Sequence, residues 1–146
     1  MGNETDAEGR KERSRRAVGL WGSDTADRPE DIFVGTYVNH QEPDVSGGAT
    51  TRSLDGYREL LDGYRRGFSD SEVAILLQIA EDNLVATRWE FTATNTGEYL
   101  GHPPSGRRAT WTGIQIDRHD GDRIAESWVD WDKFRFFVGI GRIDPI

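Results

Sequence analysis

The chain has 146 residues, enough for one domain with a buried core, and 35% of them are hydrophobic. Its net charge of −8 argues against unaided binding to nucleic acid or anionic lipid, because both require a cationic surface. It has no cysteine, which excludes disulfides, thiolate nucleophiles and zinc–thiolate sites, and no apolar run reaches the length of a membrane span. We therefore expect a soluble, cytoplasmic protein.

The N-terminal part of the chain predicts short elements. Residues 1–14 mix acids and bases with few apolar side chains and are predicted to be a disordered or frayed lead-in. The remainder, 15–146, is predicted to form a single domain. Short helices are expected near residues 15–21 and just after Pro29, and residues 33–40, FVGTYVNH, favour a strand.

After a predicted loop over residues 41–52, the pattern indicates one clear helix and then several strands. Ser53 can cap the helix, and its apolar side chains recur at steps of three and four residues: Leu54, Tyr57, Leu61, Tyr64 and Phe68. The predicted strands cover residues 72–82, which are expected to be mostly buried, and 84–94, 109–118 and 123–132, and the tail is expected to add a helix or strand. Helices followed by an antiparallel meander predict an α+β fold.

Charged residues on two predicted strands are candidates for chemistry. Arg88 and Glu90 lie two residues apart and share a strand face, which is either solvated or a polar patch inside a pocket. Asp130 and Asp132 share another face, where water is the ordinary environment and acid/base work is the alternative. The three histidines, His40, His102 and His119, lack the spacing of a metal-binding pair, so we expect no metal site.

A longer motif carries a family resemblance. The segment TGEYLGHPPSGRR (residues 96–108), followed by TGIQIDR and then ESWVDWD, resembles the SnoaL-like polyketide cyclases, also called ester cyclases, of the nuclear-transport-factor-2-like superfamily. The likeness covers roughly residues 15–138. It implies a cone in which a curved antiparallel sheet wraps over N-terminal helices around a deep apolar pocket, and it implies homodimers that pair through the sheet.

The resemblance also implies positions for site residues. Classical members close a polyketide ring by aldol chemistry with an Asp on the last long strand and a helper His on the neighbouring strand. Those two positions fall here on Val129 and Ile114, so the aldol pair is absent, unless a bulge in the turn turns Asp130 inward. In related epoxide hydrolases a Tyr-x-Asn pair holds water and an Arg-x-Asp pair accompanies it. Tyr37 with Asn39, and Arg88 with Glu90, match those pairs.

Together with the resemblance, these features predict a cofactor-independent cyclase of secondary metabolism and antibiotic biosynthesis that closes or rearranges a ring in a polyketide-like small molecule. Substrate preorganisation, in a pericyclic or oxa-cyclisation reaction, suits the missing Asp better than aldol chemistry does. The candidate catalytic residues are Tyr37, Asn39, His40, Arg88, Glu90 and Asp130, and the candidate substrate-binding residues are Tyr57, Trp111, Ile114, Ile116, Val129 and Trp131. Two alternatives stay open: an epoxide or lactone hydrolase with Asp130 or Glu90 as base, and a non-catalytic binding module that dimerises.

Overall fold

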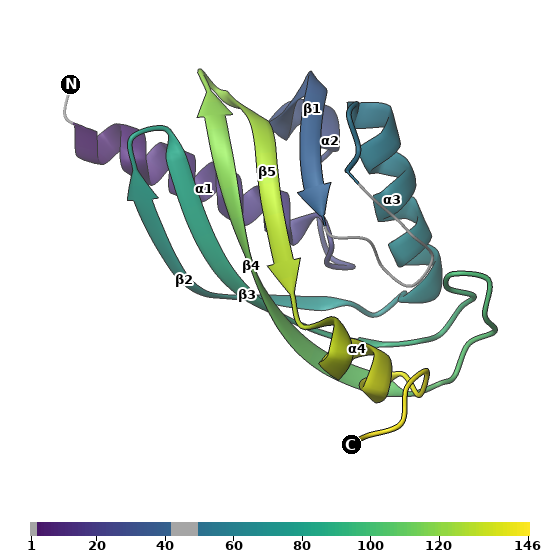
Figure 1. Cartoon of the computed structure of the whole chain (residues 1–146). Coiled ribbons are helices and arrows are strands. Elements are labelled where there is room, and N and C mark those ends of the chain that lie inside the picture. Colours follow the sequence, from purple (N-terminus) through teal and green to yellow (C-terminus); the bar gives the residue numbers. More distant parts are fainter. Residues whose placement is uncertain (1–2, 42–49) are drawn as a thin grey trace.

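The computed structural model describes residues 3–41 and 50–146, so most of the predicted loop over residues 41–52 lies outside the described residues (Figure 1). The elements follow the chain as α1 (Asn3–Gly19), α2 (Pro29–Ile32), β1 (Phe33–Gln41), α3 (Leu54–Gly67), β2 (Glu72–Glu81), β3 (Leu84–Thr94), β4 (Arg108–Asp120), β5 (Arg123–Trp131) and α4 (Lys133–Gly139). The α+β class predicted from the sequence is confirmed.

One sheet organises the described residues, with the strand order β1-β5-β4-β3-β2. Strands β2 to β5 form the predicted antiparallel meander, whereas β1 pairs with β5 in parallel. The sheet curves strongly, and helices α1 and α3 lie within its concave side (Figure 1). The concave, inner face therefore carries the core, and the convex, outer face is left without a covering element among the described residues.

Helix α1 differs from the sequence prediction. The helix begins at Asn3, so the predicted disordered or frayed lead-in is wrong for residues 3–14. Few apolar side chains pack α1 against β2 and β3, and polar contacts also attach it to the sheet. Arg15 donates to the Gln78 side chain at 2.7 Å, and Gln78 donates to the Lys11 carbonyl at 2.9 Å. Composition alone could not predict this helix, because its anchors are specific partners on distant strands.

Helix α3 matches its prediction closely. The Ser53 hydroxyl accepts a hydrogen bond from the Gly56 backbone N–H at 3.0 Å and so caps the first turn. The predicted apolar stripe is buried along its length, at Leu54, Tyr57, Leu61 and Tyr64. This stripe faces the inner side of the sheet and forms one wall of the interior.

Strand β2 is a strand as predicted, but its predicted burial is wrong. Leu77 and Ile79 are 50% and 64% exposed on the outer face. On the same face, Ile114 and Ile116 of β4, which lie beyond β3 in the same rows of the sheet, are also exposed. The outer face is thus more aliphatic than a solvated sheet surface requires.

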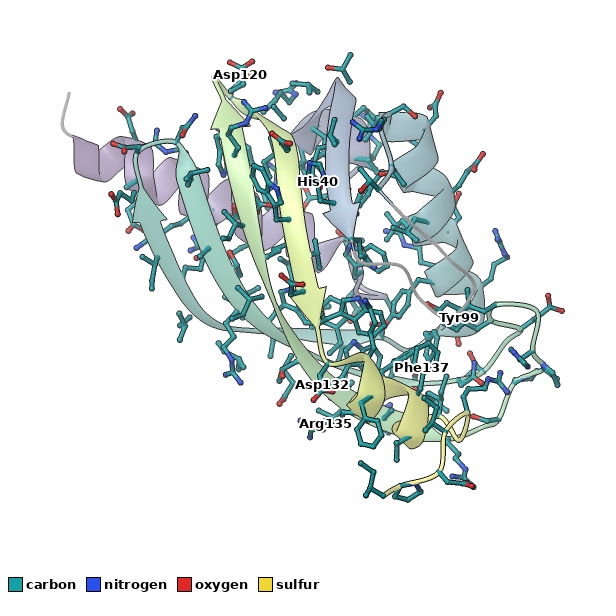
Figure 2. All side chains as sticks on the ribbon, in the orientation of Figure 1. His40, Tyr99, Asp120, Asp132, Arg135 and Phe137 are labelled. Atoms are coloured by element: carbon teal, nitrogen blue, oxygen red, sulfur yellow. The ribbon has the colours of Figure 1, made fainter. Side chains whose placement is uncertain are left out.

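The tail forms helix α4, one of its two predicted forms. Asp132 caps it by accepting from the Arg135 backbone N–H at 2.9 Å, and both residues lie at the start of the helix in Figure 2. The helix buries Phe136 and Phe137 against the end of the sheet. Asp132 therefore has a structural role at the end of β5.

Candidate active site

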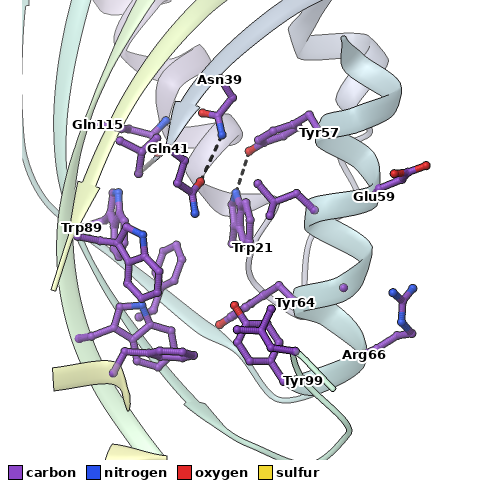
Figure 3. A pocket seen from close by; sticks show the side chains of 18 of the residues that line it. Trp21, Asn39, Gln41, Tyr57, Glu59, Tyr64, Arg66, Trp89, Tyr99 and Gln115 are labelled. Carbon is purple, nitrogen blue, oxygen red and sulfur yellow. Dashed lines mark hydrogen bonds between the residues drawn. The ribbon is translucent and has the colours of Figure 1, made fainter. Parts of the chain in front are cut away.

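A cavity of about 830 Å³ lies between α3 and the inner face of the sheet (Figure 3). Its walls are mainly aromatic: Trp21, Tyr57, Tyr64, Trp89, Phe91, Tyr99, Trp111, Trp131 and Phe136. Many of these rings contact one another edge-on, as between Trp111 and Phe136, whose centroids are 4.6 Å apart. The walls are therefore rigid, apolar and suited to a planar or polycyclic ligand.

On the sheet side of the cavity, Gly113 leaves room for the Trp89 and Trp131 side chains. In the sheet register, Trp89, Gly113 and Trp131 form one row across β3, β4 and β5. A side-chain Cβ at position 113 would come within 2.4 Å of the Trp89 ring and 2.8 Å of the Trp131 Cβ. Only glycine leaves both indoles in place.

One end of the cavity is polar, and we call its four residues the polar end: Tyr37, Asn39, Gln41 and Gln115. The first three alternate along β1 and so share its inner face. The Tyr37 hydroxyl donates to Asn39 Oδ1 at 3.4 Å, and Asn39 Nδ2 donates to Gln41 Oε1 at 3.2 Å (Figure 3 shows the second bond). These bonds orient the amides relative to the cavity.

Behind the polar end lies a fully buried carboxyl group. Asp117 follows Gln115 on the inner face of β4 and is 0% exposed. Its Oδ1 accepts from Gln115 Nε2 at 3.0 Å and from the Ser127 hydroxyl at 2.6 Å. Its Oδ2 is buried and meets no donor at hydrogen-bonding geometry among the described residues.

Burial governs the protonation of this region. It raises the pKa of Asp117 above its usual value, although the Ser127, Ser14 and Gln115 side chains oppose the shift by favouring the charged form. Burial also raises the pKa of Tyr37 well above its usual value, helped by Tyr57 and the Asp117 charge. Tyr37 is therefore a neutral phenol that acts as a hydrogen-bond donor.

Helix α1 completes the buried network on its far side. His119 is 3% exposed, and its Nδ1 accepts from Arg13 at 2.9 Å. Its Nε2 lies 3.2 Å from the Ser14 hydroxyl. Burial, followed by the charges of Arg13 and Arg10, lowers the pKa of His119 to about 4. The imidazole is therefore neutral near pH 7 and acts as a structural link between α1 and the sheet.

Half of the predicted site residues line the cavity: Tyr37, Asn39, Tyr57, Trp111, Val129 and Trp131. They come from β1, α3, β4 and β5, elements that only the folded chain brings together. Val129 faces the interior, as the family register implied. Their roles in catalysis or substrate binding remain predictions.

The three charged candidates lie elsewhere. Arg88 and Asp130 are exposed on the outer face, and Glu90 lies on that same face. Each alternates with an inward residue, Trp89 or Val129, so the pocket alternative for these charges is wrong. A bulge does occur in β5, where Arg118 pairs with Glu126 and His119 with Ile124. The inward residue before it is Ile124 and the next inward residue is Ser127, so the bulge turns Val129 inward and Asp130 outward.

Ile114 and Ile116 were predicted to line the cavity, and that prediction is also wrong. Directly opposite residues in an antiparallel pair point to the same face, and Ile114 pairs with outward-facing Asp130. The residue opposite Val129 is Gln115. The prediction placed Ile114 at the family's helper-His position, whereas this strand turns its aliphatic residues out and Gln115 and Asp117 in.

His40 is not part of the cavity lining. Its Nε2 lies 2.6 Å from Glu126 Oε2, and its ring stacks on Trp128 at a centroid distance of 5.5 Å. The His40 bond, followed by Arg118, lowers the pKa of Glu126. The pair joins β1 to β5, which explains the position of His40 on structural grounds.

Gln115 and Asp117 were missed as candidates. The sequence pattern could have identified them, because side chains alternate along a strand. Both lie an even number of residues from Trp111, which was predicted to bind substrate, and so share its face.

No cluster of three or more His, Asp or Glu side chains that could hold a metal ion occurs within the described ranges. In the same part of the chain, no helix has both the length and the apolarity to cross a membrane.

The curved sheet, the helices within it and the cavity between them define an α+β cone of the nuclear-transport-factor-2-like class. The sequence profile of the SnoaL-like polyketide cyclases matches residues 11–137, and the chain belongs to that family. A search of curated proteins returned no significant sequence match.

Solved structures agree on the fold. AclR, a proposed hydroxylase from Streptomyces galilaeus, matches with a TM-score of 0.80 and 23% identity over 96% of this chain and 85% of that one. A proposed SnoaL-like polyketide cyclase from Jannaschia sp. CCS1 matches with a TM-score of 0.82 and 16% identity over 95% of each chain. IdmH, a proposed polyketide cyclase from Streptomyces antibioticus, matches with a TM-score of 0.76 and 21% identity over 90% of this chain and 98% of its own. Identities at this level establish the shared architecture.

Proposed function

We propose that this protein is a cofactor-independent cyclase that closes or rearranges a ring in a polyketide-like secondary metabolite. The observation that carries the proposal is the aromatic cavity with the polar end formed by Tyr37, Asn39, Gln41 and Gln115. Flat apolar walls suit an unsaturated or polycyclic carbon skeleton, and the polar end suits oxygen substituents at one end of that skeleton.

The chemistry proposed for the cavity is substrate preorganisation. Confinement between aromatic rings holds a flexible chain in a reactive conformation, which can lower a barrier by several kcal/mol, and by about 7–11 kcal/mol for the best-oriented groups. The neutral Tyr37 hydroxyl orients Asn39, and the remaining N–H groups of the Asn39 and Gln41 amides can then polarise a carbonyl or hold a hydroxyl by hydrogen bonds. No charged acid or base is needed inside the cavity for a pericyclic or oxa-cyclisation step.

Hydrolysis is supported less well, because both bases proposed for it lie on the outer face. Glu90 and Asp130 are separated from the cavity by the sheet itself. Heavy-oxygen water distinguishes the two reactions, since a hydrolase incorporates its oxygen into the product and a ring closure does not.

The test is a conversion assay on the accumulated precursor. Inactivating the encoding gene in its host should accumulate an uncyclised compound, which the purified protein should convert, without added cofactor, to an isomer or to a product that has lost only water. Tyr37→Phe and Gln115→Met should each lower the rate at least about tenfold, and Arg88→Ala should retain it. Full activity of both cavity variants would contradict the proposal.

We further propose that the protein works as a cytoplasmic homodimer and that the outer face of the sheet is its interface. Arg88, Ile114 and Asp130 lie in one row across β3, β4 and β5, all on this face. A twofold axis along β4 would bring Arg88 opposite Asp130 of the partner subunit, with the aliphatic residues between them. The surface is therefore self-complementary in both charge and apolarity.

A further inference from the structure

The Gln115 side chain is held in one orientation by a residue that never reaches the cavity. Gln115 lines the cavity, whereas Asp117 is fully buried behind it. Gln115 uses its Nε2 to donate to Asp117 Oδ1 at 3.0 Å. The remaining heteroatom of the amide, Oε1, has no hydrogen-bond partner among the described residues, yet it is not among their buried unpartnered atoms. Oε1 therefore has access to the cavity.

This orientation does not depend on whether Asp117 carries a proton. Gln115 Nε2 and the Ser127 hydroxyl both reach the same carboxyl oxygen, Oδ1. The nearby Ser14 hydroxyl also favours the charged form, but its hydrogen-bond contact is with His119 Nε2. A proton on the carboxyl group would sit on Oδ2, which has no donor facing it within hydrogen-bonding geometry among the described residues. Oδ1 is an acceptor in either state, so Gln115 must present its N–H to it.

We propose that Asp117 is a positioning residue that turns the Gln115 carbonyl oxygen into the cavity and so makes the polar end select a ligand hydroxyl. The inference rests on the proposed function, because it assigns part of the substrate recognition in the same cavity. An exposed amide can rotate to offer either its oxygen or its N–H, and so cannot tell a donor from an acceptor. Gln115 has lost that freedom.

The selection acts on the hydrogen-bonding character of the ligand. A hydroxyl group placed at Gln115 donates to Oε1 and leaves no polar atom unpaired. An ether or carbonyl oxygen at the same place would face another lone pair and would also leave Oε1 desolvated without a donor. The substrate class that fits is thus an aromatic or unsaturated skeleton carrying a free hydroxyl, and its O-methylated form should bind more weakly.

The experiment compares two small probes of nearly equal shape, 2-naphthol and 2-methoxynaphthalene, by calorimetric titration of the intact protein. The wild type should bind the naphthol about fivefold more tightly, the effect of one neutral hydrogen bond. Asp117→Leu removes the acceptor and frees the Gln115 amide, so the preference should vanish. Asp117→Asn can keep an oxygen at the Oδ1 position and should keep the preference. Ser127→Ala leaves the Gln115 bond in place and is the matched control.

The possible results separate the inference from the proposed function. Equal affinity of the wild type for both probes would overturn the inference while leaving the aromatic cavity as a binding site. Binding of neither probe would overturn the inference together with the proposed function. Loss of the preference in Asp117→Asn would show that the carboxyl group acts through its charge or proton and not by positioning. Should Asp117→Leu fail to fold, Gln115→Met must abolish the preference, and a preference retained there contradicts the assignment.

Discussion

Trp89 packs directly over Gly113, so that a Cβ at position 113 would come 2.4 Å from the Trp89 ring. The two residues are register partners on β3 and β4, and Trp89 is only 3% exposed. The ring cannot retreat into the core, which is already occupied by aromatic neighbours. It can move only toward the cavity.

Gly113→Ala should therefore cost about 1–3 kcal/mol of unfolding free energy, the usual effect of overpacking, and should also narrow the cavity. Urea denaturation measures the first effect and 2-naphthol affinity the second. Gly9→Ala is the matched control, because a Cβ there meets nothing within 4 Å and the residue lies inside a helix. It should stabilise by about 0.5–1 kcal/mol. Equal effects of the two substitutions would contradict the packing described for Trp89.

The Asp132 cap can be tested against its neighbour Asp130. Asp132→Ala removes the acceptor for the Arg135 N–H and should cost about 1 kcal/mol of unfolding free energy, whereas Asp132→Asn should cost less. Asp130 is exposed and the cap bond is made by Asp132 alone among the described residues, so Asp130→Ala should change stability by no more than about 0.5 kcal/mol. Thermal or urea unfolding measures all three changes in stability. A larger loss from Asp130→Ala than from Asp132→Ala would show that Asp130, and not Asp132, caps α4.

His119 predicts a loss of stability in mild acid. Its pKa falls from 6.5 to about 4 on folding. Between these two pH values the unfolded chain therefore binds a proton at His119 and the folded chain does not. The stabilisation is complete above pH 6.5 and is lost as the pH falls toward 4. The loss should be about 1 kcal/mol per pH unit across that window.

The matched variant for this prediction is His119→Gln, which cannot titrate. The raised pKa of Asp117 acts in the opposite direction, because it weakens the fold as the pH rises, but it is common to both proteins. Unfolding free energies measured from pH 7 to 4.5 should therefore fall more steeply for the wild type than for His119→Gln. Parallel curves would show that His119 is protonated in the folded state.

The proposed dimer makes a charge-reversal prediction. Arg88→Glu and Asp130→Arg should each weaken association, because each places like charges opposite one another across the twofold axis. The double variant restores opposite charges and should recover the dimer. Light scattering after gel filtration measures the mass directly. A monomeric wild type, or a double variant no better than the single ones, rejects this interface.

The limits of prediction from the sequence follow from where the polar residues sit. The family register correctly placed Val129 inside, and the Ser53 cap correctly began α3. On β4 the aliphatic residues face outward and Gln115 and Asp117 face inward, which reverses the usual pattern. Such reversals are expected where a face serves binding and not only stability.

Helix α1 shows a second limit. Its sequence has too few apolar residues to predict burial, because its contacts with the sheet include specific bonds such as those of Arg13 and Ser14 to His119. Those partners lie more than 100 positions apart in the chain. Periodicity reports which face of an element is apolar, but it cannot report a polar bond between two distant elements.

The tryptophans allow a direct test of where the ligand binds. Of the five in the chain, four line the cavity: Trp21, Trp89, Trp111 and Trp131. The fifth, Trp128, is 39% exposed and faces outward beside His40. In a titration of ¹⁵N-labelled protein with 2-naphthol, followed by the indole N–H resonances, cavity binding predicts shifts of the four cavity signals and a constant Trp128 signal. A shift confined to Trp128 would place the ligand on the outer face and contradict the central assignment of this cavity as the functional site.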